Sequence, residues 1–563
     1  MDRVYPITRL PLPPGVRLLE NVYITMRDGV RLAVDVYLPE APGKYPVLLG
    51  SSPYRKEAQL GSPVKGYHSE VCDPGVYIPR GYIVCVASTR GTGMSQGQYN
   101  YYDIEEQKDG YDLVEGIARQ PWCDGNIGMI GGSYYGKSQY YTAAQRPPHL
   151  KCIVPFGASI DIYRDLVYHT GGCFFGPGFM DRWASEVNSD CLWPGPVEGK
   201  LPPMNMSLAY HENFLDGPWY WERSLYPTLN RIQCPVLHIA SASSWLNCRG
   251  QLLGYSMIKS TQKLVIGPPN YNASYSRLFW GDKYITEYVL RWYDYWLKGI
   301  DTGIMQEPPV LIYDRGADEW RYENEYPLAR MKMTKFFLHS NPDKPDFPQG
   351  LINTDLPGMS ESPDTFASPR DRSAGDKPPL AYVTAPLVNE LKLHGPISAT
   401  LYGSTLTENT APIAWFVKVG EVRPDGKVSL ITKGCLKASH RKVDESKSKP
   451  GQPWHPFDEQ VYIEAGQVYD FQIEFQPLFH TFKAGYRIWL QIACDDPEFR
   501  LNNIQDRVMG PVPARNTIYH DQFHPSHLLL PVIPEAPIIA PVKQPMWSKE
   551  NMENIGLSRS TMM

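Results

Sequence analysis

Short apolar runs recur along the first 330 residues and predict most of the fold. Each run is apolar at consecutive positions, which is typical of a strand buried on both faces of a sheet. The runs stand at residues 45–50, 82–87, 127–131, 235–240 and 263–267. Between the second and third runs, residues 105–120 place Tyr111, Val114 and Ala118 on one helical face, and Pro121 ends the pattern. Strands that alternate with helices predict a mostly parallel sheet with helices on both faces.

This alternation stops twice, and each break predicts a separate unit. Residues 160–231 have helical, aromatic-rich patterns without a buried strand, which indicates a helical cap inserted into the sheet domain. From residue 331 onward, apolar and polar positions alternate between loops rich in Pro, Asp, Gly and Ser, a pattern typical of a jelly-roll β-sandwich. The predicted organisation is an α/β core (1–159 and 232–330), a helical cap (160–231) and a C-terminal jelly roll (331–563).

Composition argues against several classes of function. The 563 residues include 60 acidic and 55 basic side chains, a net charge of −5 that argues against a nucleic-acid-binding surface. The ten cysteines form no CxxC pair, so we predict no metal and no cofactor. We find no run of about 20 apolar residues that would predict a membrane span, and no secretory apolar segment near the start. We therefore expect a cytoplasmic protein without a membrane partner, for which a homo-oligomer is possible.

The segment MIGGSYYGK, residues 129–137, carries the first candidate for chemistry. A predicted strand precedes Ser133 and a predicted helix follows it, so the serine stands at a sharp strand-to-helix turn. Such a turn needs small neighbours, which Gly131, Gly132 and Gly136 provide. Many hydrolases present a nucleophilic serine in this way. The alternative is a small residue that only fits a tight turn.

Further motifs along the chain match one protein family. They are ITMRDGVRLAVDVYLP at 24–39, SSPYRK at 51–56, STRGTGMSQGQY at 88–99, WYDYWLKGIDTGIMQEPPVLIY at 292–313 and KGCLKASHRKVDESKSKPGQPWHPF at 433–457. Together with the serine segment they closely resemble the cocaine esterase-like group. That group is related to X-Pro dipeptidyl-peptidases and to glutaryl-7-aminocephalosporanic acid acylase-type hydrolases. The resemblance implies an α/β-hydrolase core with a helical cap insertion and a C-terminal β jelly-roll domain.

The resemblance also implies roles for individual residues. Ser133 matches the nucleophile. Tyr54 matches the tyrosine that donates its hydroxyl to the oxyanion, together with the backbone N–H of Tyr134. A phenol and an amide aimed at one oxygen stabilise the negative charge that develops there. The alternative for Tyr54 is a tyrosine that only packs.

The other two members of the expected catalytic triad are missing. In the family an aspartate follows the strand that matches residues 235–240, and here its position falls between Ser243 and Trp245. The family histidine follows the next strand, and here Tyr271 takes its place. Serine at its ordinary pKa is a poor nucleophile without an adjacent base. Tyr271 could bond to Ser133, but a phenol is a weak base at neutral pH.

Other residues could replace the missing base. Residues 223–281 contain no Asp or Glu, and the histidine among them, His238, lies inside a predicted strand and is expected to be a core residue. Lys137 stands one helical turn after Ser133, and a desolvated lysine can act as a base. His169 could reach the pocket from the cap, and Trp245 is expected to line it. Lys137, His169 and Cys248 each have packing as the alternative role.

The sequence leaves three hypotheses for function. The first is an enzyme repurposed for a non-hydrolytic transformation, such as cyclisation, cycloaddition or isomerisation, of a hydrophobic carbonyl-containing small molecule in natural-product biosynthesis. The second is a serine esterase, amidase or acyltransferase that uses Ser133 with an unusual base. The third is a pseudoenzyme that binds a small molecule without turning it over. The first is favoured because the oxyanion donors are present while the triad base and acid are absent.

Overall fold

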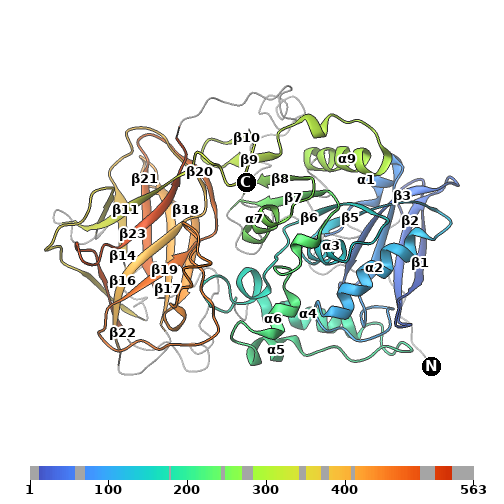
Figure 1. The fold of residues 1–563 in the computed structure, drawn as a ribbon, viewed down its shortest axis with the longest axis horizontal. Coiled ribbons are helices and arrows are strands. Elements are labelled where there is room, and N and C mark those ends of the chain that lie inside the picture. The colour runs from blue at the N-terminus through green and yellow to red at the C-terminus, as the bar shows by residue number, and fades with distance from the viewer. Residues whose placement is uncertain are drawn as a thin grey trace.

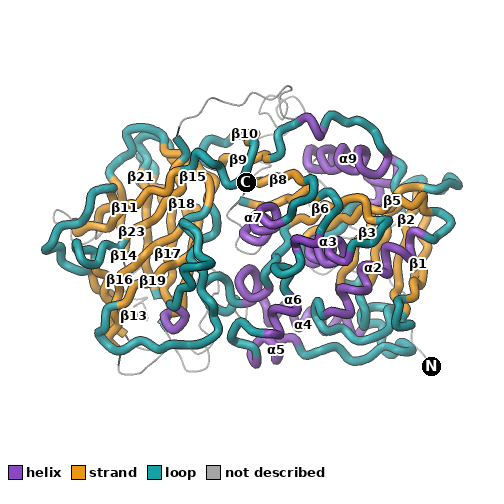
Figure 2. The backbone as a smooth tube through the Cα atoms, viewed as in Figure 1, coloured by secondary structure: helices purple, strands orange, loops and turns teal. Residues whose placement is uncertain are grey.

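The computed structural model shows a sheet domain and a β-rich domain side by side, with a helical segment between them (Figure 1). It describes residues 12–56, 70–175, 179–242, 248–268, 283–341, 350–368, 380–407, 413–494 and 514–534. Within these ranges no helix is long and apolar enough to span a bilayer. Helices gather in the sheet domain and the segment between, whereas strands and loops dominate the other domain (Figure 2).

The first sheet has the strand order β1-β2-β4-β3-β5-β6-β7-β8-β9-β10. Neighbouring strands from β4 to β9 run parallel, whereas β1, β2 and β10 pair antiparallel with their neighbours. The strands are β1 (Val16–Thr25), β2 (Arg31–Pro39), β3 (Tyr45–Ser52), β4 (Ile83–Ser88), β5 (Cys123–Gly132), β6 (Leu150–Phe156), β7 (Val236–Ser241), β8 (Gln262–Gly267), β9 (Val310–Asp314) and β10 (Glu319–Glu323). The predicted mostly parallel sheet is confirmed.

Helices bury both faces of this sheet. In β4, Ile83 and Cys85 pack into the core on one face and Val84 and Val86 into the core on the other. Helices α2 (Ile104–Ala118), α3 (Tyr134–Gln145) and α7 (Cys248–Met257) lie on the first side, and α1 (Pro74–Tyr77) and α9 (Lys283–Lys298) on the second. This double burial explains why the predicted strands are continuous apolar runs.

Between β6 and β7 the described residues form helices without a strand. A π-helix (Ile162–Val167) is followed by α4 (Asp181–Leu192), α5 (Met206–Glu212) and α6 (Pro218–Arg223). This segment lies below the sheet and beside the β-rich domain in Figure 1. It is the helical cap that the aromatic pattern predicts, although the predicted domain boundaries themselves stay predictions.

The C-terminal domain is a β-sandwich of mostly antiparallel strands. Its described path runs β13-β22-β16-β23-β11-β12-β14-β21-β17-β18, with β15, β19 and β20 paired beside it. The strands are β11 (Lys332–Ser340), β12 (Gly350–Asn353), β13 (Asp364–Ser368), β14 (Leu380–Thr384), β15 (Leu391–Gly395), β16 (Ser398–Thr407), β17 (Ala414–Val422), β18 (Val428–Lys437), β19 (Tyr469–Glu474), β20 (Leu478–Phe482), β21 (Arg487–Ala493), β22 (Ala514–Tyr519) and β23 (His527–Val532). The predicted jelly-roll domain is confirmed.

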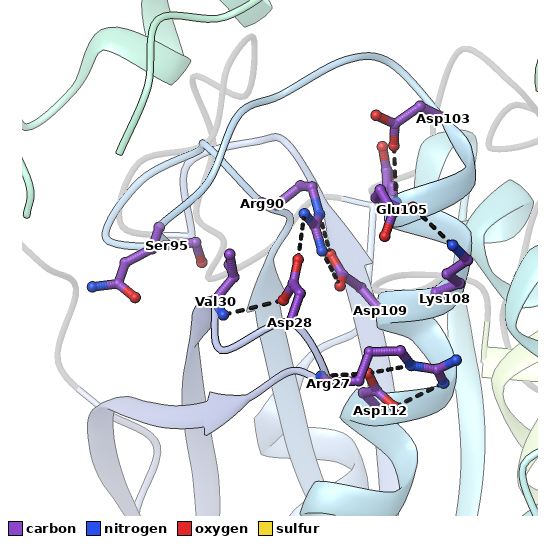
Figure 3. Close-up of polar contacts among 12 residues, drawn as sticks. Arg27, Asp28, Val30, Arg90, Ser95, Asp103, Glu105, Lys108, Asp109 and Asp112 are labelled. Carbon is purple, nitrogen blue, oxygen red and sulfur yellow. Dashed lines mark hydrogen bonds and ion pairs between the residues drawn. The ribbon is translucent and has the colours of Figure 1, made fainter. Parts of the chain in front are cut away.

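Ion pairs tie the β1–β2 turn and the Arg-Gly turn after β4 to α2 (Figure 3). The Arg90 guanidinium donates two hydrogen bonds to the Asp109 carboxylate of α2, at 2.5 and 2.6 Å, and a third to Asp28 at 3.1 Å. Arg27 pairs with Asp112 at 2.9 Å on the surface. The STRGTGMSQGQY segment therefore anchors a loop against the helix that leads to β5.

A buried ion pair network joins the three parts of the molecule. Arg249 at the start of α7 donates to Asp165 of the cap at 2.8 Å and to Glu474 of the jelly roll at 2.9 Å. All three side chains are at most 8% exposed. Because buried charges need partners, this network fixes the cap and the jelly roll against the core.

We expect Arg249→Met to destabilise the protein by about 3–5 kcal/mol, because it leaves two carboxylates buried without their cation. The matched control is Arg27→Met, which removes a pair that is half exposed on the arginine side and should cost about 1 kcal/mol or less. Urea unfolding of both variants measures the difference. Equal losses in the two variants would contradict the assigned role of Arg249.

Candidate active site

Ser133 lies at the turn between β5 and α3, where the backbone is strained. Its φ of 56° and ψ of −119° lie in a region that residues with a side chain rarely adopt. The Ser133 N–H donates to the Phe156 carbonyl of β6 at 3.0 Å, and the Lys137 N–H donates to the Ser133 carbonyl at 3.0 Å. These bonds hold Ser133 at the carboxyl edge of the sheet, where it is partly exposed.

Two glycines make this turn sterically possible. A Cβ on Gly131, whose φ is 124°, would lie 2.5 Å from the Cβ of Tyr135. A Cβ on Gly136 would lie 2.6 Å from the Phe156 carbonyl oxygen. Neither position tolerates a side chain, so the shifted glycine of GGSYYG is explained by the close approach of α3 to β6. The turn has the geometry of a nucleophile elbow.

The two predicted oxyanion donors flank the elbow. The Tyr54 ring, just after β3, packs edge-on against the rings of Tyr134 and Tyr135, each with a centroid distance of 6.0 Å. Its hydroxyl oxygen accepts a hydrogen bond from the Trp183 indole at 3.1 Å. The N–H of Tyr134 is at the first position of α3, where a helix has no internal acceptor for it. This placement is compatible with the predicted roles, which stay predictions.

The Tyr134 side chain is fixed on the other side by Glu106. Its hydroxyl lies 2.7 and 3.0 Å from the two carboxyl oxygens, and Glu106 also accepts from the Tyr102 N–H at 2.9 Å. Burial raises the pKa of Glu106 to about 8. The sequence alone does not identify Glu106 as a site residue. The pattern Asp103-x-x-Glu106 is typical of a capping box, and it predicts that the Glu106 carboxyl lies at the start of α2.

An aromatic cluster surrounds Tyr134. The Tyr102 ring stacks on it at 3.9 Å, and Trp183 of α4 lies 6.3 Å away on a nearly parallel plane. Tyr101 and Tyr102 both have positive φ, at 56° and 58°. Two adjacent strained residues are uncommon, and they hold both rings between the core and the cap. Sequence reasoning did not single out these residues, because nothing local marks a loop tyrosine with a positive φ.

Lys137 points into this aromatic cluster. Its side chain is buried, and its Nζ atom lies 4.6 Å from the centre of the Tyr102 ring. No described residue accepts a hydrogen bond from Nζ. Burial lowers the Lys137 pKa to about 7, against the influence of Asp165, Asp161 and Glu106. Lys137 is therefore a buried lysine one turn from Ser133, and its role as a base or pocket residue stays a prediction.

The segments that should carry the triad acid and base lie outside the described residues. These are 243–247 and 269–282, so the structure does not place Ser243, Trp245 or Tyr271. The strands before them, β7 and β8, run parallel to β5 and end at the same edge as Ser133. Residues 243–247 and 269–282 contain no histidine, and the single acidic residue in the two segments is Asp282, at the end of the second.

His238 does not supply the missing base. Its Nδ1 lies 2.7 Å from the Tyr140 hydroxyl and its Nε2 lies 3.1 Å from Gln262 Oε1. Burial lowers its pKa to about 4, so the ring is neutral at pH 7. The sequence interpretation of His238 as a core residue agrees with these contacts.

His169 and Cys248 are also buried. The His169 ring packs edge-on against Phe175 at 4.7 Å. Burial and the charge of Lys433 in β18 lower the His169 pKa to about 3. The ring therefore stays neutral and lies toward the jelly roll, and its predicted place in the pocket stays a prediction. Cys248 is enclosed at the start of α7. The described His, Cys, Asp and Glu side chains form no group suited to a metal ion.

A strained serine elbow after a central strand of such a sheet, with a helical cap beside it, defines a protein of the α/β-hydrolase class. Comparison with known proteins gives the family. The X-Pro dipeptidyl-peptidase (S15 family) domain matches residues 28–270, and the X-Pro dipeptidyl-peptidase C-terminal non-catalytic domain matches residues 302–529. The chain therefore belongs to the cocaine esterase-like and X-Pro dipeptidyl-peptidase-like hydrolase family, as its motifs predict.

Individual relatives agree along nearly the whole chain. Cocaine esterase from Rhodococcus sp. is 27% identical over 91% of this chain and 98% of its own length. A CocE/NonD family hydrolase from Staphylococcus aureus has the same fold, with a TM-score of 0.80 at 20% identity over 95% of this chain and 99% of its own. An α-amino acid ester hydrolase has a TM-score of 0.72 at 18% identity, over 94% and 99% of the two chains.

The strain at Ser133 predicts an order of stability among its variants. Ser133→Gly should be more stable than Ser133→Ala by about 1 kcal/mol, because glycine adopts the observed φ and ψ without the steric cost. Chemical denaturation of the two variants measures this difference directly. An alanine variant at least as stable as the glycine variant would show that the turn is not strained at this residue.

The lowered pKa of Lys137 predicts that the stability of the protein depends on pH. The folded protein releases the Lys137 proton near pH 7, whereas the unfolded chain keeps it up to the ordinary pKa of 10.5. Stability should therefore rise with pH between these values. Lys137→Met removes this cost, so its gain in melting temperature should be larger at pH 7 than at pH 10. A gain that does not change with pH would contradict a depressed Lys137 pKa.

Proposed function

We propose that the protein is an enzyme that activates a carbonyl group without the family's histidine–aspartate relay. It binds a hydrophobic carbonyl-containing small molecule at Ser133 and polarises the carbonyl with the Tyr54 hydroxyl and the Tyr134 N–H. It then transforms the molecule by cyclisation, cycloaddition or isomerisation rather than by hydrolysis. Natural-product biosynthesis is the setting in which such a reaction is expected.

One observation carries this proposal. The elbow and both candidate oxyanion donors are present around Ser133, whereas the two strand-end segments that should carry the triad base and acid contain no histidine and have Asp282 as their acidic residue. Oxyanion donors stabilise negative charge on any carbonyl oxygen, whether or not a nucleophile attacks the carbon. Loss of the relay costs acyl transfer several orders of magnitude in rate but leaves this polarisation in place.

The chemistry of the surroundings supports a hydrophobic substrate. Tyr102, Tyr134 and Trp183 form an aromatic cluster next to Tyr54. Aromatic surfaces bind apolar molecules through burial of large areas, and a few polar groups then orient them. A carbonyl is the group that the two donors fit, since it presents an acceptor oxygen to both.

A serine esterase, amidase or acyltransferase is the second candidate, and the strain at Ser133 favours it. Strained residues persist where the fold or the mechanism requires them, and this strain presents the serine as a nucleophile does. The names of the relatives, such as cocaine esterase, point the same way. In this case Lys137, whose pKa is near 7, would be the base.

Covalent labelling separates the two candidates. The full-length protein is incubated with a fluorophosphonate, and intact mass is measured over time. We expect Ser133 to react about a thousand-fold more slowly than the serine of an intact triad, because no base activates it. Ester hydrolysis of p-nitrophenyl butyrate should be equally slow in the wild type and in Ser133→Ala. Ser138→Ala is the matched control for a serine in the same helix.

Stoichiometric labelling of Ser133 within minutes, abolished by Ser133→Ala and not by Ser138→Ala, would overturn the proposed function in favour of the serine hydrolase. Lys137→Met would then identify the base, because it should slow the labelling if Lys137 activates the serine. A protein that binds a hydrophobic ketone, but neither reacts with the fluorophosphonate nor changes the ketone, would instead be a pseudoenzyme.

A further inference from the structure

Glu70 lies directly against the serine elbow. Its backbone carbonyl accepts the N–H of Gly132 at 2.7 Å, one residue before Ser133. A Cβ on Gly131 would lie 3.0 Å from the same carbonyl oxygen, so the segment at Glu70 and the end of β5 are in close contact. The backbone of an acidic residue therefore lies next to the serine elbow. This residue comes from neither of the segments in which the family keeps its base and acid.

The chain that follows fixes Glu70 in this position. Val71 is buried, and its side chain packs against Gly50 of β3. A Cβ on Gly50 would lie 3.1 Å from the Val71 side chain and 3.0 Å from the Tyr135 ring. Cys72 is buried, and the Asp73 carboxyl caps α1 by accepting from the Gly75 N–H at 2.8 Å. Glu70 is therefore held from one side by β5 and from the other by a packed segment and a helix cap.

The Glu70 carboxyl is poorly solvated and unpaired. The residue keeps partial access to solvent, but its Oε2 atom is enclosed and no described residue donates a hydrogen bond to it. Burial alone raises the Glu70 pKa to about 8, without a charged partner that contributes. A carboxyl in this state exists in both protonation forms near neutral pH, as a group that takes up and returns a proton must.

Among the other buried titratable groups, Lys137 shares this state, whereas Glu106 and the two buried histidines of the core and cap differ from it. Glu106 has a similar pKa, but its oxygens already accept from Tyr134 and Tyr102. His169 and His238 are too weakly basic to hold a proton at neutral pH, with pKa values of about 3 and 4. A carboxyl buried without a partner costs stability that a glutamine at the same place would not, and such groups gather at functional sites.

We propose that Glu70 is the acid–base residue of the Ser133 site. This proposal rests on the proposed function and specifies its proton transfer. A Glu70 carboxylate oxygen takes a proton from the carbon next to the substrate carbonyl. The electron pair of that C–H bond forms a carbon–carbon double bond, and the π pair of the carbonyl moves to its oxygen. The Tyr54 hydroxyl and the Tyr134 N–H stabilise the resulting enolate oxygen.

The same proton completes the reaction. In a substrate with a carbon–carbon double bond next to the acidic C–H, the Glu70 carboxylic acid returns the proton to the far carbon of that double bond. The double bond then moves next to the carbonyl as the carbonyl re-forms, so that the product is an isomer and no atom or electron is gained or lost. Enolates also close rings by attack on a second electrophile within the molecule, and Glu70 then protonates the new alkoxide. The proposed role of Glu70 therefore implies the substrate class, which is a hydrophobic carbonyl compound with an acidic hydrogen on the carbon next to the carbonyl.

Hydrogen–deuterium exchange tests this without the natural substrate. The full-length protein is mixed with 4-phenylbutan-2-one in D₂O, and loss of the hydrogens beside the carbonyl is followed by proton NMR. The wild type should accelerate exchange over buffer, with a rate that rises with pH through an apparent pKa of about 8. Glu70→Gln should lower the rate about 100-fold or more and flatten its pH profile.

Two further variants complete the design. Glu115→Gln is the matched control, because Glu115 lies in α2 and contacts His149 away from the elbow, and its exchange rate should equal that of the wild type. Tyr54→Phe should slow exchange while the pH profile stays, since it removes an oxyanion donor and not the base. A melting temperature of Glu70→Gln at or above that of the wild type at pH 8 shows that the variant is folded.

The outcomes separate the two proposals. Exchange that is equal in the wild type and in folded Glu70→Gln would overturn the role of Glu70 and leave the proposed carbonyl activation standing. A wild type that exchanges no faster than buffer would overturn both the enolisation and the proposed function. Exchange that depends on Glu70 but not on Tyr54 would support Glu70 and contradict the oxyanion role of Tyr54.

Discussion

The strained turn at Ser133 is the constraint on which the site depends. Two backbone hydrogen bonds hold it, from Ser133 to Phe156 and from Gly132 to Glu70, and two glycines leave room for them. The turn fixes the first N–H groups of α3 at the carboxyl edge of the sheet. It also brings Glu70, from a distant part of the chain, next to the serine. Packing of the buried strands on either side offsets this strain, and the other site residues lie around the turn.

The groups around this turn are mostly held in their neutral forms. Burial raises the pKa of Glu106 to about 8 and lowers that of Lys137 to about 7. A triad relay needs an ionised acid to stabilise an imidazolium, and neither has a counterpart among the described residues near Ser133. A low-dielectric site with aimed donors instead strengthens each hydrogen bond to a carbonyl oxygen. This is the environment that the proposed carbonyl polarisation uses.

Much of the fold could be predicted from the sequence, but less of the site. Apolar runs predict β3, β4, β5, β7 and β8, because both faces of those strands are buried, whereas β6 is not among the predicted runs. GGSYYG predicts the elbow because glycines are needed there. Glu70 and the Tyr101–Tyr102 pair gave no such signal. Their importance comes from contacts across the fold and from backbone strain, which no local pattern encodes. His238 shows the reverse, since mid-strand placement alone predicts a core role that its two hydrogen bonds support.

The central claim is that the site polarises a carbonyl without attack by Ser133. The ¹³C NMR signal of 4-phenylbutan-2-one labelled at the carbonyl carbon, bound to the wild-type protein, tests it most directly. The account predicts a trigonal carbonyl signal shifted downfield from its position in water, and a smaller shift with Tyr54→Phe. An upfield signal of a tetrahedral adduct, present in the wild type and absent in Ser133→Ala, would contradict the account and show that the serine is still a nucleophile.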